Sequence, residues 1–221
     1  MTVTQAQQCP LCQNDEISLY AVVKPSGGVK KDYYHCPRCF LIFVPSPFHL
    51  DPAREKERYD LHENSPDDEA YVKFLSKLTG PLLWRLKPGW EGLDFGCGPG
   101  PTVSAILKKE GLRVFDYDPF YFPEKKLLER QYDFITCTEV LEHLRFPRES
   151  FILWERLLRA GGTIAVMTEV WQEKEPFSNW WYLKEPTHIC FFRQQTFLWV
   201  AKWLDWHCEF PHLNVVVFTK K

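Results

Sequence analysis

From residue 92 onward, short apolar runs alternate with amphipathic segments. Apolar runs bounded by turn residues predict strands, and apolar positions at helical spacing between them predict helices. Strands that alternate with helices are typical of a parallel sheet with helices on both faces, so the pattern predicts an α/β fold. The predicted strands cover 92–95, 112–117, 132–138, 163–168, 207–210 and 214–219, and the predicted helices cover 101–110, 147–159 and 194–204.

The preceding segment, residues 53–88, has a helical pattern. Its first part, residues 53–64, is strongly charged. Ser65 followed by Pro66 predicts the N-cap and the first position of a helix. Apolar residues on one helix face follow, and they are Tyr71, Phe74, Leu75 and Leu78. We therefore expect a helical linker over residues 51–90 and an α/β domain over residues 91–221.

The first fifty residues contain short apolar runs around turns, with a cysteine pair at each end. Cys9 and Cys12 lie in CPLC, and Cys36 and Cys39 lie in CPRC, with the apolar runs and the turn between the two pairs. Four thiolates in two such knuckles bind Zn²⁺ as a closed structural site, and the metal supplies folding energy that a small core lacks. The pattern predicts a zinc ribbon over residues 1–50, with a rubredoxin-like iron site as the alternative. Its expected strands lie at 19–23, 32–34 and 40–44, and its expected turn lies at 26–28.

Charge and composition narrow the classes of partner. The 221 residues include 27 Lys and Arg and 29 Asp and Glu, for a net charge of −2. Such a chain lacks a large basic footprint for a phosphate backbone, which makes nucleic acid a second choice as partner. No apolar run approaches the roughly 20 residues of a membrane span, and the chain does not start like a signal peptide. We therefore expect a cytoplasmic protein without a membrane partner, in which the remaining cysteines are core thiols. These are Cys97, Cys137, Cys190 and Cys208.

A glycine-rich turn at residues 96–100, GCGPG, follows the first strand of the α/β region. Glycines allow a ligand to approach the backbone closely, and the next helix offers unpaired amides at its N-terminus. The spacing is GxGxG and not the GxGxxG of nicotinamide-binding proteins, because Pro101 occupies the sixth position. An acidic residue about 20 positions further on binds ribose in such folds. Asp116 and Asp118, at the end of the next predicted strand, both fit this spacing from Gly96.

Four segments in order, LDFGCGPG, VFDYDP, YDFITCTEVLEHL and LLRAGGTIAVMT, resemble the motifs of the Rossmann-like S-adenosylmethionine-dependent methyltransferases. The resemblance covers residues 92–219. It implies that the glycine loop wraps the methionine part of the cofactor, that Asp118 binds the ribose, and that Thr138 and Glu139 face cofactor and substrate. The cofactor-binding residues implied in this way are Asp94, Gly96, Cys97, Gly98, Gly100, Asp118, Thr138 and Glu139. Zinc ribbons ahead of such a domain occur in bacterial families that this chain resembles.

The sequence departs from this family after the second strand. Only the short segment 119–131 lies between Asp118 and Tyr132, where the family has a helix, a strand and a second helix. A crossover alone needs about a dozen residues. We therefore expect six strands in the order 2-1-4-5-7-6, in the family's numbering, without the usual adenine loop. Residues 120–122, Phe-Tyr-Phe, either cover the adenine instead or pack over the sheet edge.

Glu139, Glu142 and His143 share one face if the segment after the third strand is helical. An ExxEH pattern here resembles the small-RNA 2′-O-methyltransferases and the ubiquinone-biosynthesis O-methyltransferases, which bind a divalent metal and add a later histidine. His188 is the matching histidine. The resemblance makes Glu142, His143 and His188 the catalytic candidates. It leaves open a second metal ion on these residues and Glu139, a histidine as base or substrate contact, and a structural role.

An aromatic segment, residues 171–192, follows the fourth strand, close to where ligands bind in such sheets. It is expected to form a substrate lid with His188 pointing inward, or an aromatic cluster over the last helix. The resemblance implies methyl transfer from S-adenosylmethionine to a small molecule, with oxygen as the favoured acceptor atom. The alternatives are a non-catalytic binding module with a degenerate domain and an RNA methyltransferase. The sequence does not predict the oligomeric state.

Overall fold

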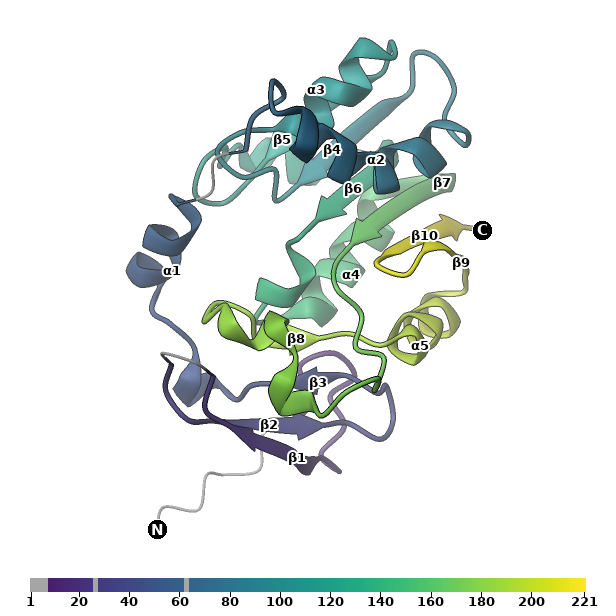
Figure 1. Ribbon diagram of the computed structural model, residues 1–221. Helices are drawn as coiled ribbons and strands as arrows, with labels where there is room; N and C mark the ends of the chain where they lie inside the picture. Colours follow the sequence, from purple (N-terminus) through teal and green to yellow (C-terminus); the bar gives the residue numbers. More distant parts are fainter. Residues whose placement is uncertain (1–7, 26–27, 62–63) are drawn as a thin grey trace.

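The computed structural model describes residues 8–25, 28–61 and 64–221, and in this part of the chain it contains two β-sheets (Figure 1). Two residues of the expected ribbon turn, 26 and 27, lie outside the described residues. None of the helices in the described part is both long enough and apolar enough to cross a bilayer.

The larger sheet has six strands in the order β5-β4-β6-β7-β10-β9. The first four are parallel, β10 is antiparallel to β7, and β9 is antiparallel to β10. This is the 2-1-4-5-7-6 order expected from the sequence, and the predicted fold class is confirmed. The strands are β4 (Glu91–Phe95), β5 (Arg113–Tyr117), β6 (Tyr132–Thr138), β7 (Leu158–Met167), β9 (Trp206–His212) and β10 (Val215–Lys220).

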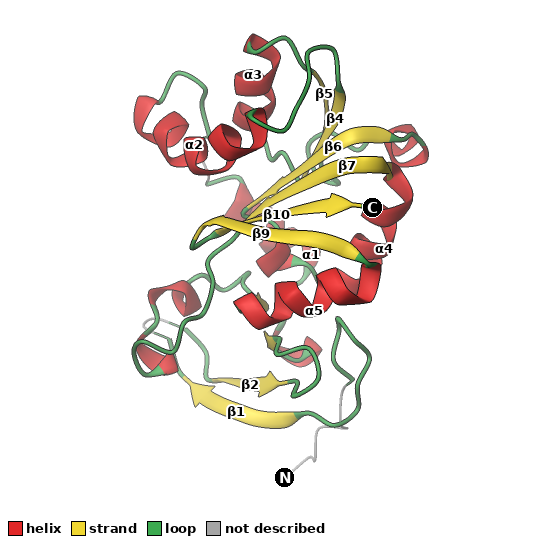
Figure 2. Ribbon diagram, turned by 90° about the vertical axis from the view of Figure 1, so that its right-hand side faces the viewer, coloured by secondary structure: helices red, strands yellow, loops and turns green. Residues whose placement is uncertain are grey.

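Helices cover both faces of this sheet (Figure 2). Side chains alternate across each strand, so Phe134 packs with the α2 and α3 side chains whereas Ile135 joins the core on the opposite face. Two hydrophobic layers therefore hold the sheet. The helices are α1 (Pro52–Tyr59), α2 (Glu69–Leu83), α3 (Thr102–Lys109), α4 (Pro147–Leu157) and α5 (Gln194–Leu204).

The connection from β5 to β6 is short, as expected. A bridge between Asp118 and Phe122 and a 3₁₀ helix, Lys125–Glu129, take the place of a helix–strand–helix crossover. The Tyr132 hydroxyl donates to the Leu127 carbonyl at 2.7 Å, which fixes this short segment to the start of β6. As a result β5 lies at one edge of the sheet.

The smaller sheet has the order β1-β2-β3-β8 and includes a strand from far along the chain. Ile42 pairs with Phe191, and Phe43 pairs with Cys190, so the aromatic segment supplies the fourth strand of the N-terminal ribbon. Both sheets contribute to one buried hydrophobic cluster. The strands are β1 (Ser18–Val23), β2 (Lys31–His35), β3 (Ile42–Phe43) and β8 (Cys190–Phe191).

The N-terminus of α2 differs from the sequence prediction. The helix begins at Glu69, and its N-cap is Asp68, whose carboxylate accepts from the amides of Ala70 (2.8 Å) and Tyr71 (3.1 Å). Ser65 instead closes a turn, because its carbonyl accepts from the Asp68 amide at 3.2 Å. The Ser-Pro pair was therefore the wrong start, since the Asp68 carboxylate binds two of the amides that a helix leaves free.

The boundary between α4 and β7 also differs from the prediction. The helix ends at Leu157 and the strand already begins at Leu158, so residues 160–162 belong to the strand. Gly161 has a φ of +72°, and the β6–β7 register shifts between Tyr132 and Phe134. The glycines therefore form an irregular strand start and do not terminate the helix.

Candidate functional site

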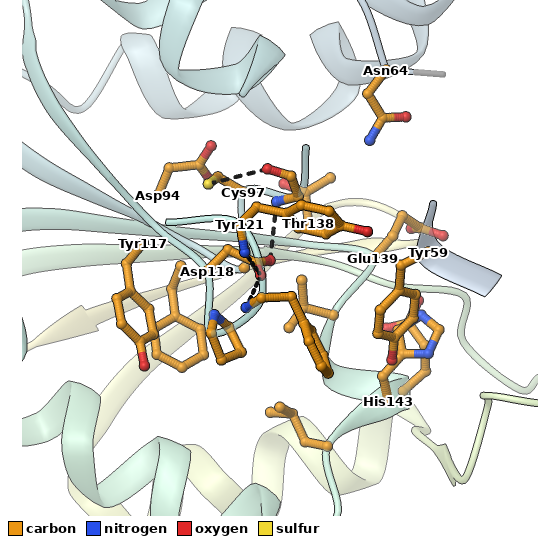
Figure 3. Close-up of a pocket in the computed structure, with 18 of the residues that line it drawn as sticks. Tyr59, Asn64, Asp94, Cys97, Tyr117, Asp118, Tyr121, Thr138, Glu139 and His143 are labelled. Carbon is orange, nitrogen blue, oxygen red and sulfur yellow. Dashed lines mark hydrogen bonds between the residues drawn. The ribbon is translucent and has the colours of Figure 1, made fainter. Parts of the chain in front are cut away.

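A pocket of about 880 Å³ lies at the carboxyl ends of β4, β5 and β6 (Figure 3). Every residue that the sequence implicated in cofactor binding or catalysis lines it. Ligands bind at this edge of open α/β sheets. The residues brought together are Asp94, Gly96, Cys97, Gly98, Gly100, Asp118, Thr138, Glu139, Glu142, His143 and His188.

The glycine loop is held tightly between neighbouring segments. Gly96 and Gly98 have φ values of +78° and +66°, which side-chain-bearing residues rarely adopt. A Cβ on Gly96 would collide with Val140, and one on Gly100 would collide with the Asn64 carbonyl. The glycines therefore allow the loop to lie close to two pocket walls, leaving its backbone along the pocket.

Asp118 joins the glycine loop to the segment after β5. Its Oδ2 accepts from the Gly98 amide at 3.1 Å, and its Oδ1 accepts from the amides of Phe120 (2.8 Å) and Tyr121 (3.2 Å) (Figure 3). These bonds curve the chain so that Phe120 and Tyr121 line the pocket. Phe122 forms the bridge to Asp118 and is 36% exposed.

Several acidic or polar groups face the pocket from the strand ends. Asp94 is buried and accepts from the Thr136 hydroxyl at 2.7 Å, and burial raises the pKa of Asp94 to about 7. Burial, together with Glu142 and Glu169, also raises the pKa of Glu139 well above its usual range. Glu139 has a left-handed backbone conformation with a φ of +53°. Its backbone amide donates a hydrogen bond to the Met167 carbonyl at 2.8 Å, which holds this conformation.

Two polar atoms in this wall, Thr138 Oγ1 and Glu139 Oε1, are buried and have no hydrogen-bond partner among the described residues. A buried polar atom without a partner costs about 1–3 kcal/mol, so such atoms in a pocket wall suit a polar ligand. A cationic ligand beside Asp94 and Glu139 would favour their ionised forms and offset the rise in their pKa values, so this wall suits a cation. The glycine loop, the carboxyl groups of the wall and the two unpartnered oxygen atoms together fit the ammonium and sulfonium groups of S-adenosylmethionine.

His143 and His188 come from distant segments and meet at the opposite side of the pocket. His143 ends a 3₁₀ helix, Leu141–His143, and its ring centroid lies 4.8 Å from that of His188. Nδ1 of His143 lies 3.2 Å from the Thr187 carbonyl, and Nδ1 of His188 lies 2.8 Å from the Tyr182 carbonyl. Because a carbonyl only accepts, each Nδ1 must donate, and each neutral imidazole has its lone pair on Nε2.

The two histidines differ in burial. His188 is 8% exposed, and burial together with the nearby His143 lowers the pKa of His188 to about 4. His143 is half-buried. His188 is therefore neutral at physiological pH, with a lone pair that can accept a hydrogen bond or coordinate an ion.

Glu142 is fully buried beside this pair, and both of its oxygens already accept hydrogen bonds. Oε1 accepts a short bond from the Tyr182 hydroxyl, and Oε2 accepts from the Thr168 hydroxyl at 2.9 Å. Glu142, His143 and His188 bring potential ligand atoms within 4.8 Å of one another, and Glu139 is not in this group. Coordination of an ion by Glu142 would compete with hydrogen bonds that it already accepts.

The aromatic segment packs mainly on the ribbon, not on the last helix. Phe177 contacts Tyr20 and Tyr33 edge-on, with centroids 5.2 Å apart in both pairs, and Trp171 Nε1 donates to the Tyr20 hydroxyl at 3.0 Å. Phe192, at its end, stacks on Phe197 of α5. The residues of this segment that line the pocket are Trp181, Tyr182, Glu185 and His188. The segment thus places one end on the pocket and anchors the rest in the ribbon.

The four N-terminal cysteines are buried and face one another. Sγ of Cys9 lies 3.4 Å from that of Cys39, and the same distance separates Cys12 from Cys36, too far for a disulfide. All four sulfurs lie within 4.8 Å of one another. Zn–S bonds of about 2.3 Å in a tetrahedron place sulfurs about 3.8 Å apart, so this cluster fits Zn²⁺.

Other residues that line the pocket were not predicted from the sequence. Glu55 and Tyr59 come from α1, Asn64 from the segment after it, and Arg145 from the segment after the 3₁₀ helix. The sequence of this segment signals only that a helix begins there, because Asp51 is the N-cap of α1 and Pro52 is its first residue. That α1 covers the pocket depends on contacts between residues far apart in the chain.

Comparisons with known proteins agree with this geometry. A family model described as "Methyltransferase domain" matches residues 64–208. The PH0226 protein from Pyrococcus horikoshii is 13% identical, over 70% of this chain and 93% of that chain, with a TM-score of 0.51. At this identity the similarity establishes the fold alone. A search of the curated proteins finds no match.

Two further solved structures are similar. An S-adenosylmethionine-dependent methyltransferase from Archaeoglobus fulgidus is 16% identical, over 68% of this chain and 99% of that chain, with a TM-score of 0.48. An O-methyltransferase family protein from Burkholderia thailandensis is 11% identical, over 76% of this chain and 63% of that chain, with a TM-score of 0.47.

Proposed function

Because the chain belongs to the methyltransferase-domain family and is an S-adenosylmethionine-dependent enzyme, we propose that it methylates an oxygen atom of a small molecule in the described pocket. One observation carries the proposal. The imidazoles of His143 and His188, each with Nε2 available, line the same pocket as the glycine loop and Asp118. A single pocket can therefore bind cofactor and acceptor next to each other.

The cofactor would bind along residues 96–100, with its ribose hydroxyls on Asp118. Asp94 and Glu139 would face its cationic end, and the unpartnered oxygens of Thr138 and Glu139 would accept from its ammonium group. Phe120 and Tyr121 line the pocket beside Asp118, which supports their covering the adenine in place of the missing loop. Tyr121 also donates to Asp60, which fixes its ring there.

S-adenosylmethionine supplies a methyl group that is already activated by a positively charged sulfur. The protein then has two tasks, to align the acceptor with this methyl group and to remove the acceptor's proton. We assign the second task to His143, whose Nε2 would take the hydroxyl proton as the oxygen forms its new bond to carbon. His188, neutral and packed on His143, would fix the orientation of that ring.

The charges near the two histidines favour an uncharged small acceptor. Arg145 pairs with Glu55 at 2.8 Å, and Arg58 pairs with Glu185 at 2.7 Å. These pairs leave neither cation for a phosphate backbone, which makes RNA the weaker alternative. The glycine loop and the pocket also argue against a degenerate, non-catalytic domain.

A metal ion on Glu142, His143 and His188 is the second candidate mechanism, but the two hydrogen bonds that Glu142 accepts favour a metal-free base. Zn²⁺ is assigned to Cys9, Cys12, Cys36 and Cys39 as a structural ion. We keep the division into a ribbon at 1–50, a linker at 51–90 and a methyltransferase domain at 91–221 as part of the proposal. The cytoplasm is kept as the proposed location.

The proposal is tested by calorimetric titration with S-adenosylmethionine and by methyl-transfer assays on hydroxyl, amine and carbon acceptors. We expect micromolar cofactor binding and transfer to a hydroxyl. Asp118→Ala should weaken cofactor binding at least tenfold, because it removes the ribose contact and releases the Gly98 amide. The matched control is Asp133→Ala, at the opposite end of the sheet, whose carboxylate accepts from the Glu91 amide. Absence of binding at high micromolar concentration, or unchanged affinity in Asp118→Ala, would refute the assignment.

A further inference from the structure

Helix α1 contains no buried residue, although it lies between the two sheets (Figure 1). It is eight residues long and mostly charged. A helix of this length is not stable on its own in water, and most helices are held by an apolar face that packs on a core. Other contacts must therefore hold α1 in place.

Those contacts reach the walls of the pocket. Glu55 accepts from Arg145, which follows the 3₁₀ helix, at 2.8 Å. Arg58 donates to Glu185 of the aromatic segment at 2.7 Å. At the end of the helix, Asp60 accepts from the Tyr121 hydroxyl at 2.7 Å. The helix therefore connects the catalytic, acceptor and cofactor sides of the pocket.

Tyr59 lies at the centre of these contacts. Its ring meets the His143 ring nearly at right angles, with centroids 5.2 Å apart, and lies 5.7 Å from Phe120 (Figure 3). Its hydroxyl donates to Glu55 Oε1 at 3.0 Å, and Glu55 is in turn fixed by Arg145. The ring of Tyr59 is thereby held against the imidazole of His143.

Two aromatic rings thus enclose the His143 imidazole, since the His188 ring packs against it with centroids 4.8 Å apart. The hydrogen bond from Nδ1 of His143 to the Thr187 carbonyl is long, at 3.2 Å, and by itself it would restrict rotation of the imidazole only weakly. A ring that contacts the imidazole edge-on restricts that motion.

We propose that Tyr59, from the segment between ribbon and methyltransferase domain, is a positioning residue that holds the His143 imidazole toward the acceptor, and that α1 is a wall of the acceptor site. This inference rests on the proposed role of His143 as the base. The proposal makes the linker part of the active site. An acceptor would then enter the pocket only through the side that α1 does not cover.

The test compares Tyr59→Ala and Tyr59→Leu, which remove the ring, with Tyr59→Phe, which keeps the ring and removes its hydroxyl together with the bond to Glu55. Glu57→Ala, at an exposed position of the same helix, is the control. We expect a fall in kcat of about 10- to 100-fold without the ring, because a misplacement of about 1 Å costs up to about 100-fold. The KM for the acceptor should change less than kcat, and the Kd for S-adenosylmethionine should change less than threefold. Tyr59→Phe should keep at least half of wild-type kcat.

A second readout does not depend on catalysis. When the Tyr59 ring is removed and S-adenosylhomocysteine is bound, the His143 ring should adopt more than one orientation, seen at constant pH as exchange-broadened or duplicated ring-proton resonances. A change in chemical shift alone does not count, because loss of the Tyr59 ring current also causes it. A kcat within twofold of wild type in Tyr59→Ala, equal loss in Tyr59→Phe, or single sharp His143 resonances without the Tyr59 ring would overturn the proposal. Broadened or duplicated resonances in a protein that methylates no hydroxyl would reject the proposed function and keep the positioning role. Melting temperatures identify a variant that fails to fold, and Tyr59→Leu, which retains bulk, then takes the place of Tyr59→Ala.

Discussion

The described part of the chain contains two groups of side chains that could hold a metal ion, and their surroundings are very different. In each group the candidate ligand atoms lie within 4.8 Å of one another. The four cysteines face one another. Apart from these contacts, the cluster has a weak hydrogen bond from Asn14, whose Nδ2 lies 3.9 Å from Cys36 Sγ. In the second group Glu142 accepts from Thr168 and Tyr182, and both imidazoles donate to backbone carbonyls.

The carboxylate distinguishes the two groups. Histidines that bind metals also donate their second nitrogen to carbonyls, so the bonds of His143 and His188 fit both a metal site and a base. Both oxygens of Glu142 already accept hydrogen bonds, and one of these bonds holds Tyr182 of the aromatic segment. Proximity of ligand atoms is therefore a weaker criterion for a metal site than the hydrogen bonds that those atoms already make.

The largest expected effect is on the cysteine cluster. Cys36→Ser should reduce bound zinc from one equivalent per chain to none and unfold residues 8–50, because structural zinc contributes about 10–16 kcal/mol in small zinc-finger peptides. Since β8 pairs with β3, residues 171–189 should become sensitive to protease as well, while S-adenosylmethionine still binds the glycine loop. Metal analysis, limited proteolysis and calorimetry measure these effects.

Cys208→Ser is the matched control, because Cys208 lies in β9 and is half-buried, outside the cluster. It should keep its zinc and its resistance to protease. A metal-free Cys36→Ser protein that remains fully folded would contradict the structural role of the cluster.

The next effect concerns the histidine pair. His143→Ala should lower kcat by about 100-fold or more, the usual contribution of a general base. His188→Ala should lower turnover about tenfold by releasing the His143 ring. Both variants should bind S-adenosylmethionine as the wild type does, by calorimetry. Full activity in His188→Ala would remove its part in catalysis.

A smaller effect follows from the burial of His188. Its pKa is about 4 in the folded protein and about 6.5 in the unfolded chain. The unfolded state therefore binds the proton first as the pH falls, and stability that is complete above pH 6.5 is lost progressively down to pH 4, by about 3 kcal/mol at most. Denaturant unfolding between pH 7.5 and 4.5 measures this slope.

His188→Gln should flatten the slope, and His212→Gln, at an exposed histidine, should leave it unchanged. The same slope in His188→Gln as in the wild type would mean that other groups cause it. If a metal ion were bound to His188, the dependence of wild-type stability on pH would change when a chelator is added. The metal-free, hydrogen-bonded group predicts no effect of chelator.

The smallest effect should be that of divalent ions on catalysis. Because Glu142 is engaged, removal of Mg²⁺ and Mn²⁺ under conditions that leave the cysteine-bound zinc in place should change kcat less than twofold. Initial rates after dialysis, with and without each ion, measure this. A loss of tenfold or more that Mg²⁺ or Mn²⁺ restores would make the second group a metal site after all.

Much of the fold could be predicted from local patterns. The alternation of apolar positions predicted the strands of the larger sheet, and the short segment between Asp118 and Tyr132 predicted the missing strand, because chain length limits what a connection can contain. The start of α2 could not be predicted with the same certainty, since Ser65 and Asp68 both suit an N-cap and only the observed amide bonds select Asp68.

By itself the sequence determined which segments form strands, the place of the glycine loop and the spacing of the two cysteine pairs, since each depends on residues close together in the chain. The order of the strands followed from the resemblance to the methyltransferase family. Only the tertiary structure decided that β8 completes the ribbon, that α1 lies over the pocket, and that Tyr59 packs against His143. These contacts join segments separated by many residues, through hydrogen bonds, ion pairs and aromatic contacts. Such contacts leave no periodic pattern in a sequence, because any of several distant side chains could make them.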